Sequence, residues 1–161
     1  MSADEHAQQW HAVDQRERIK ALKYAYFRCC DTKDPDGFRD TFVASGSELD
    51  YGPLGTTDAD GMCAVFRQVA LATDAAGKHT VLDMHHGMHP VITLTGPNTA
   101  TGMWTLRFRS LNLTERRETI LTGEYDDRYV VENGLWKIQR SRFRTTWRMT
   151  RPIPETAVIE Q

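Results

Sequence analysis

The apolar positions follow a helical period over the first part of the chain. Residues 4–32 contain no proline or glycine. Within them, apolar residues recur at intervals of three or four: Ile19, Leu22, Tyr26 and Cys29 or Cys30. This spacing gathers the apolar side chains on one face and predicts an amphipathic helix.

Two shorter helices are expected to follow. Asp34 and Pro35 provide an N-cap and a first-turn proline for a second helix that runs through residue 42. Thr57 or Asp58 can cap a third helix. Its apolar face contains Met62, Val65, Phe66, Val69 and Ala70.

After residue 90 the apolar period changes from 3.6 to 2, which predicts strands. The expected strands cover residues 91–95, 99–109, 119–131 and 135–149, with a short earlier strand at 48–51. In the second of the long strands, alternate residues share one face: Ala100, Gly102, Trp104, Leu106 and Phe108. Helices followed by long antiparallel strands predict an α+β fold, with the helices on one face of a curved sheet.

The dipeptide Asn133-Gly134 predicts a tight hairpin between the last two strands. Uninterrupted pairing from this turn places Arg144 on the inner face. A bulge near residues 140–142 instead turns Phe143, Thr145 and Trp147 inward and Arg144 outward. The sequence leaves both registers open.

Length, charge and cysteine content exclude several classes of protein. The 161 residues predict one domain, residues 1–151, followed by a tail at 152–161. Twenty basic and 22 acidic residues give a net charge of −2, which argues against nucleic acid or an anionic membrane as partner. No apolar run reaches the roughly 20 residues of a membrane span, and the first residues lack the apolar core of a signal peptide. Three cysteines, two of them adjacent, form no disulfide framework, so we expect a cytoplasmic protein.

Three histidines lie close together just before a predicted strand, at His85, His86 and His89. Their spacing matches no recognised ligand pattern, so we expect no metal ion. A histidine that acts as a base needs a partner that fixes its tautomer, and Asp31 at the end of the first helix is a candidate. The alternative for Asp31 is a solvated turn residue.

Strict alternation places His85 and His86 on opposite faces of the strand. His86 then shares a face with Ile92, and His85 faces the interior only if Gly87 or Pro90 interrupts the pleat. We take His85 as the first candidate for the base and His86 as the second.

Four segments resemble the SnoaL-like branch of the nuclear transport factor 2-like superfamily: residues 26–34, 85–93, 99–104 and 129–138. Within that branch the motifs are most similar to those of the bile-acid 7α-dehydratases, which are steroid dehydratases. Hexachlorocyclohexane dehydrochlorinases and scytalone dehydratases are more distant likenesses. The resemblance implies a cone-shaped α+β barrel around an apolar pocket, no cofactor, and a homotrimer.

The resemblance also implies roles for individual residues. Asp31 and His85 fall on the positions of an Asp–His catalytic dyad, and Tyr26 falls on that of a pocket tyrosine. The family's pocket aspartate falls on Phe108, and its pocket arginine falls near Thr145, one residue from Arg144. We expect substrate contacts from Phe108 and Arg144 at these positions. We also expect them from Tyr51 and Trp104, whose strands can line the same cavity.

The function that this pattern favours is a cofactor-independent dehydratase. It would eliminate water from a hydroxysteroid-like or other apolar polycyclic alcohol. The alternatives are a double-bond isomerase or cyclase that uses the same dyad, and a small-molecule-binding module without turnover. Apolar residues in the extended tail, such as Ile153 and Val158, further suggest a homo-oligomer, with a trimer favoured over a dimer.

Overall fold

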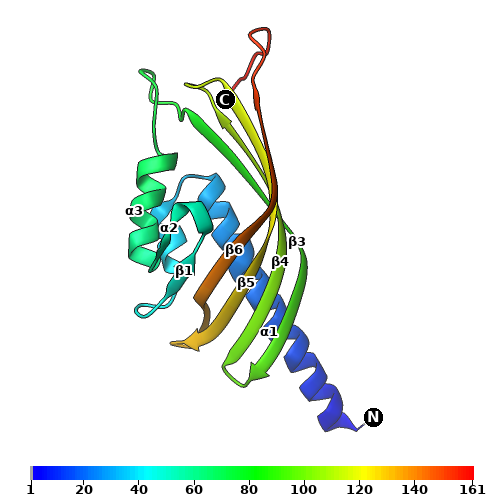
Figure 1. Ribbon diagram of the computed structural model, residues 1–161. Coiled ribbons are helices and arrows are strands. Elements are labelled where there is room, and N and C mark those ends of the chain that lie inside the picture. Colours follow the sequence, from blue (N-terminus) through cyan, green and yellow to red (C-terminus); the bar gives the residue numbers. More distant parts are fainter. Residues whose placement is uncertain (1) are drawn as a thin grey trace.

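In the computed structural model, which describes residues 2–161, three helices pack against one face of a six-stranded sheet (Figure 1). The helices are α1 (Ala3–Asp31), α2 (Pro35–Asp40) and α3 (Ala59–Ala70), with a 3₁₀ turn at Gly52–Leu54. The strands are β1 (Glu48–Asp50), β2 (Thr56–Thr57), β3 (Val81–Gly96), β4 (Thr99–Asn112), β5 (Arg117–Glu132) and β6 (Leu135–Pro152). The α+β prediction is confirmed.

Side chains cap the start of each helix. Ser2 and Glu5 form a capping box at α1. The Asp34 carboxylate accepts a hydrogen bond from the Gly37 amide at 2.8 Å, as expected for the start of α2. Asp58 is the residue that caps α3. Because these caps satisfy amides that have no partner within the helix, they fix where each helix begins.

The strand order is β2-β1-β6-β5-β4-β3, with β1 parallel to β6 and every other neighbour antiparallel. Helix α1 runs diagonally along the inner face, and its first turns project beyond the sheet (Figure 1). Strand β3 comes last in this order, so it is an edge strand. The end of α1 lies next to it. It begins at Val81, ten residues before the start expected from the sequence.

Strand β3 changes face at a bulge between Met88 and Val91. His89 has a φ of 51° there, and Pro90 follows it. The interruption allows both His85 and Ile92 to face the interior, although strict alternation would separate them.

Strand β6 contains two register shifts against β5. The hairpin begins in the predicted register, with Val131 opposite Trp136. A shift at Gln139 then places Tyr125 opposite Phe143, so Phe143 and Thr145 face inward, as in the bulged alternative. A second shift at Thr146 makes Trp147 face outward instead, and it is 51% exposed.

The core contains an ion pair that the sequence pattern does not indicate. Lys23 on α1 and Asp127 on β5 are both fully buried, and Lys23 Nζ lies 2.8 Å from Asp127 Oδ2. The ammonium also lies 3.7 Å from the ring centroid of Tyr125. Asp127 accepts two further hydrogen bonds, from the Tyr129 hydroxyl at 2.8 Å and from the Ser141 hydroxyl at 2.7 Å. The carboxylate therefore lies among three donor groups and away from water.

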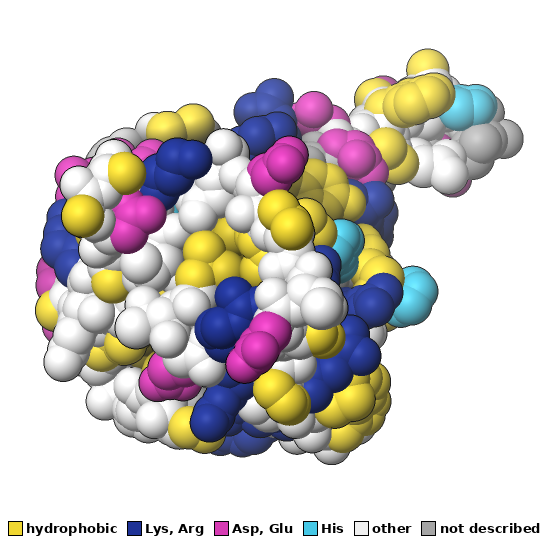
Figure 2. Space-filling model, turned by 90° about the horizontal axis from the view of Figure 1, so that it is seen from above, with side chains coloured by type: hydrophobic (Ala, Val, Ile, Leu, Met, Phe, Trp, Pro, Cys, Tyr) yellow, Lys and Arg dark blue, Asp and Glu magenta, His cyan; other side chains and the backbone are white. Residues whose placement is uncertain are grey.

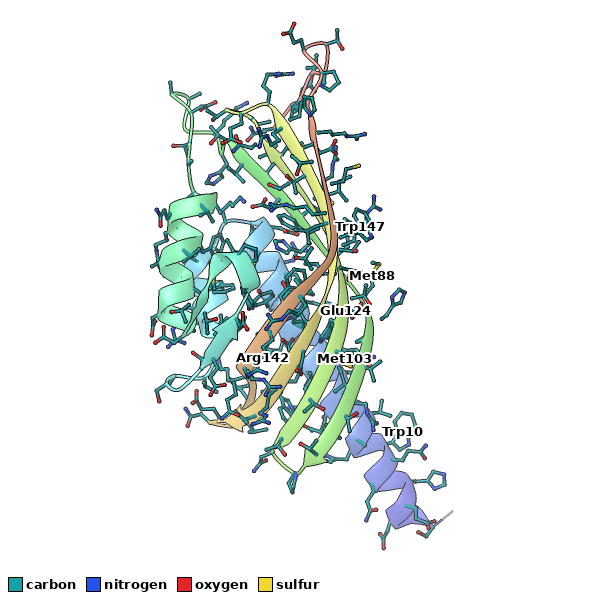
Figure 3. The ribbon with its side chains drawn as sticks, viewed as in Figure 1. Trp10, Met88, Met103, Glu124, Arg142 and Trp147 are labelled. Carbon is teal, nitrogen blue, oxygen red and sulfur yellow. The ribbon has the colours of Figure 1, made fainter. Side chains whose placement is uncertain are left out.

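The outer face of the sheet carries large apolar side chains. Met88, Met103 and Trp147 lie on the side away from α2 and α3 (Figure 3). In the tail, Ile153 is buried against its own chain, whereas Val158 is 84% exposed. Among residues 2–161, no helix is both long enough and apolar enough to cross a membrane.

Candidate active site

The structure brings Asp31 and His85 into direct contact. Asp31 is the last residue of α1, and His85 lies on the neighbouring edge strand β3. His85 Nδ1 lies 2.6 Å from Asp31 Oδ1. The backbone amide of His85 donates to the same carboxylate, at 3.0 and 3.1 Å from its two oxygens. These bonds offset the unfavourable position of a carboxylate at the negative end of a helix.

The partner of Nδ1 determines the tautomer of His85. An ionised carboxylate only accepts hydrogen bonds, so the hydrogen between the two groups belongs to Nδ1. The second ring nitrogen, Nε2, then carries a lone pair. The imidazole is 15% exposed and lines the large cavity. The arrangement presents a base to a ligand in that cavity.

Aromatic rings hold the imidazole in place. Phe108 packs on His85 with ring centroids 4.6 Å apart, and Phe27 stacks on it at 6.0 Å and 20°. Gly87 makes room for Phe27, because a Cβ at this position would overlap the phenyl ring. The ring of His85 therefore keeps one orientation.

A cavity of about 390 Å³ lies between α3 and the inner face of the sheet. Seen from above, hydrophobic side chains lie in a hollow with charged side chains around its rim (Figure 2). Helix α3 contributes Met62 and Phe66, and the sheet contributes Leu106, Phe108 and Leu121. The volume falls within the range of about 300–1,000 Å³ that is typical of small-molecule sites.

Two tyrosines add polar groups to this apolar lining. The Tyr26 hydroxyl donates to the Tyr51 hydroxyl at 2.9 Å, and both residues line the cavity. Burial raises the pKa of Tyr26 well above its usual value, and the neighbouring Tyr125 raises it further. Burial likewise raises the pKa of Tyr51. Both phenols stay protonated at neutral pH and act as hydrogen-bond donors.

The cavity lining also contains charged residues that sequence reasoning missed. Asp83 lies two residues before His85 on the same face, and it forms an ion pair with Lys33. Arg148 lines the cavity from β6. The period-two pattern gave a clue to Asp83. For Arg148, the uninterrupted register from the Asn133-Gly134 turn already placed even-numbered residues inward, and the shifts at Gln139 and Thr146 together restore that phase.

Three candidates from the sequence lie outside the cavity lining. Trp104 is fully buried in the core below the cavity, where its indole N–H donates to the Tyr129 hydroxyl at 2.9 Å. Arg144 points away from the cavity because of the shift at Gln139, and it binds Asp50 at 2.6 Å. His86 is exposed on the outer face of β3. Among the remaining candidates, Tyr26, Tyr51, His85 and Phe108 line the cavity, and Asp31 contacts His85.

Within the part of the chain that the structure describes, no cluster of three or more His, Cys, Asp or Glu side chains has the geometry to hold a metal ion. The polar groups around the cavity are instead a base, phenol donors and single charges. This set suits acid–base chemistry on an organic ligand.

Comparison with known proteins agrees with this architecture. Residues 11–142 match the family model of the SnoaL-like domain. The chain belongs to this family. The SnoaL-like domain expected from the sequence motifs is thereby confirmed, while the finer resemblance to bile-acid 7α-dehydratases stays a prediction.

Solved structures similar to this SnoaL-like chain share its fold at low sequence identity. A candidate scytalone dehydratase from Novosphingobium aromaticivorans aligns with a TM-score of 0.72 and 22% identity, over 92% of this chain and 97% of that chain. A hexachlorocyclohexane dehydrochlorinase, LinA-type3 from Novosphingobium barchaimii, aligns with a TM-score of 0.75 and 12% identity, over 95% and 99% of the two chains. The Kfla4162 protein from Kribbella flavida gives 0.72 and 16%, over 86% and 95%.

Proposed function

We propose that this protein is a cofactor-independent lyase that eliminates water from an apolar polycyclic alcohol such as a hydroxysteroid. The contact of 2.6 Å between His85 Nδ1 and Asp31 Oδ1 carries the proposal, because it orients the imidazole as a base toward an apolar cavity. Relatives described as a candidate scytalone dehydratase and as a dehydrochlorinase support an elimination reaction.

The reaction begins with proton transfer. His85 Nε2 takes a proton from a carbon that is activated by a conjugated ketone, and the electron pair of that C–H bond moves to the ketone oxygen to give an enolate. Asp31 stabilises the imidazolium that forms. Tyr51, which accepts a hydrogen bond from Tyr26, donates its own hydroxyl hydrogen to the enolate oxygen.

Elimination follows when the enolate collapses. Its electron pair forms a new C=C bond, and the C–O bond to the hydroxyl group breaks. The departing oxygen takes the proton from the imidazolium of His85 and leaves as water, which restores the neutral base. Positioned acid–base catalysis of this kind contributes about 10²–10⁴-fold to the rate.

A double-bond isomerase is the second candidate, and the composition of the lining favours it. Phe108 stands beside His85, and Asp83, the lining carboxylate among residues 2–161, is paired with Lys33. The site therefore offers no acid other than the His85 imidazolium, which in the lyase must reach both the carbon and the departing hydroxyl. An isomerase needs no such acid, since His85 can return the proton to a different carbon.

Incubation with a panel of 3-oxo-Δ4 hydroxysteroids tests the proposal. A lyase releases water, so the product loses mass and its ultraviolet absorption moves to longer wavelength. An isomerase changes the absorption at constant mass. Binding without either change would support the non-catalytic module and refute both enzyme assignments.

The variant His85→Gln should lose about 10²–10⁴-fold in kcat, because it lacks the basic nitrogen. His86→Gln is the matched control, since it changes an adjacent histidine on the outer face, and it should keep full activity. Equal activity of the two variants would contradict the assignment of His85 as the base.

A further inference from the structure

Asp83 brings a carboxylate oxygen that lacks a hydrogen-bond donor into the cavity. The residue lines the cavity from β3, and its side chain is only 11% exposed. Lys33 Nζ forms an ion pair with Asp83 Oδ2. No donor among residues 2–161 hydrogen-bonds the other oxygen, Oδ1, which the protein leaves accessible. Because a nearly buried acceptor is stable only with a partner, Oδ1 is suited to a donor on a ligand.

Lys33 neutralises this carboxylate although its own backbone is strained. It follows Thr32, the C-cap of α1, and has a φ of 61°. Glycine is the usual residue in this left-handed conformation after a helix. A glycine would relieve the strain, but it has no side chain to reach Asp83. The pair carries no net charge, so Oδ1 is an acceptor for a neutral hydroxyl group rather than a site for an ammonium ion.

The free acceptor lies beside the base. Asp83 and His85 are two residues apart on β3 and both line the cavity, so their Cα atoms are separated by roughly 7 Å. One oxygen atom with hydrogen bonds of about 2.8 Å to two groups spans up to about 5.6 Å. This span matches the interval once the two side chains lean toward the shared oxygen. One ligand hydroxyl group therefore fits between Asp83 Oδ1 and His85 Nε2.

We propose that Asp83 accepts a hydrogen bond from the departing hydroxyl group of the substrate and holds its oxygen beside His85 Nε2. The inference rests on the proposed function and names the residue that binds the leaving group. Once His85 has taken the proton from carbon, the imidazolium gives that proton to the held oxygen as the C–O bond breaks. Water leaves, and Asp83 stays ionised throughout. In an isomerase no hydroxyl group leaves, and this acceptor would have no partner in the reaction.

Binding of unreactive analogues tests the proposal. The probes are saturated 3-oxo steroids that each carry one hydroxyl group, at different ring positions and in both orientations, and the parent steroid without it. They lack the conjugation that activates the C–H bond, so they bind without elimination. Isothermal titration calorimetry should show that one hydroxylated probe binds the wild type about tenfold more tightly than the parent. Its analogue with an amine in place of the hydroxyl group should lack this advantage.

Paired substitutions remove the acceptor without leaving a buried charge. Lys33→Met/Asp83→Leu should fold, because apolar replacement of a buried ion pair is often neutral for stability. It should bind the hydroxylated probe and the parent equally. Lys33→Met/Asp83→Asn supplies a neutral acceptor and should regain part of the preference. Arg67→Met/Asp36→Asn is the matched control, since it removes an exposed pair between α3 and α2, and it should keep the full preference.

Three results overturn the proposal. The first is that the wild type binds no hydroxylated probe more tightly than the parent, which does not depend on the folding of any variant. The second is a preference that survives in Lys33→Met/Asp83→Leu. The third is tighter binding of the amine than of the alcohol, since Asp83 would then act as a free anion. Elimination by a wild type without the preference would refute this inference alone, whereas an Asp83-dependent preference without turnover of any conjugated hydroxysteroid would refute only the proposed function.

Discussion

Removal of the Asp127 carboxylate should cost this protein a large part of its stability. In Asp127→Asn the side chain keeps its shape, but the buried Lys23 ammonium loses the negative charge that lies 2.8 Å from it. Breaking one partner of a buried pair costs about 3–5 kcal/mol, because the remaining charge has neither water nor counter-ion. That loss is a substantial part of a total unfolding free energy of about 5–15 kcal/mol.

Urea unfolding followed by circular dichroism measures the loss. With a slope of about 2 kcal/mol per molar urea, the midpoint should fall by roughly 1.5–2.5 M. Asp126→Asn is the matched control, since Asp126 is 55% exposed and its bond to Arg140 is 3.1 Å long. Exposed pairs of this kind contribute about 0–1 kcal/mol. If the two variants lose the same small amount, the buried pair is not the stabilising element described above.

The pH dependence of Asp127→Asn gives an independent check. Burial lowers the pKa of Lys23 from its usual 10.5, and Asp127 opposes that shift. Without the carboxylate the pKa of Lys23 falls further. The unfolded chain then binds the lysine proton more tightly than the folded chain, so stability must rise as pH increases toward 10.5. If the unfolding free energy of Asp127→Asn stays constant or falls as the pH rises toward 10.5, the reasoning is refuted.

Three further predictions concern other parts of the molecule. Gly87→Ala should lower the free energy of unfolding by about 1–3 kcal/mol, because the new Cβ displaces the Phe27 ring that stacks on His85. Activity should fall as well. If urea unfolding and activity are both unchanged, the Phe27 ring moves aside without cost and the prediction is wrong. Hydrogen bonds from Arg151 and Arg109 lower the pKa of Glu118 below its usual 4.5. Glu118→Gln should therefore be less stable than the wild type at pH 7. The difference in unfolding free energy between the two proteins should shrink as the pH falls below 4.5. A gap that persists in acid would contradict it. Light scattering during size exclusion should report a homo-oligomer, because Met103 and Trp147 on the outer face of the sheet are each more than 50% exposed. The family resemblance favours a trimer over a dimer, and a monomer mass at micromolar concentration would contradict the prediction.

Local chemistry made much of this fold predictable from the sequence. Asp34 and Asp58 cap helices because their short side chains reach the first free amides. Capping residues of this kind can be recognised from the sequence without knowledge of the tertiary structure. The Asn133-Gly134 turn likewise fixed the start of the last hairpin. In the site, Asp31 was a candidate because it ends the predicted first helix, whereas His85 lies inside β3 and was assigned through the family resemblance.

The features that the sequence did not predict depend on long-range packing. Lys23 lies on the buried face of α1 between Ile19 and Tyr26. A lysine is expected to be exposed to solvent, and its burial becomes predictable only when the position of its partner Asp127 is known. The inward positions of Phe143, Thr145 and Arg148 on one strand depend on two unpaired residues, Gln139 and Thr146, which no local pattern marks. Both cases require knowledge of how distant segments meet.

The shift at Thr146 has an evolutionary consequence. Trp147 and Arg148 are neighbours, and the position of one bulge decides which of them enters the cavity. Moving that bulge past them, by an insertion or deletion compensated further along β6, would exchange a guanidinium for an indole without altering either residue. The charge of the cavity lining can thus change while the residues at both positions stay the same. Comparisons that track only substitutions at lining positions would overlook such a change.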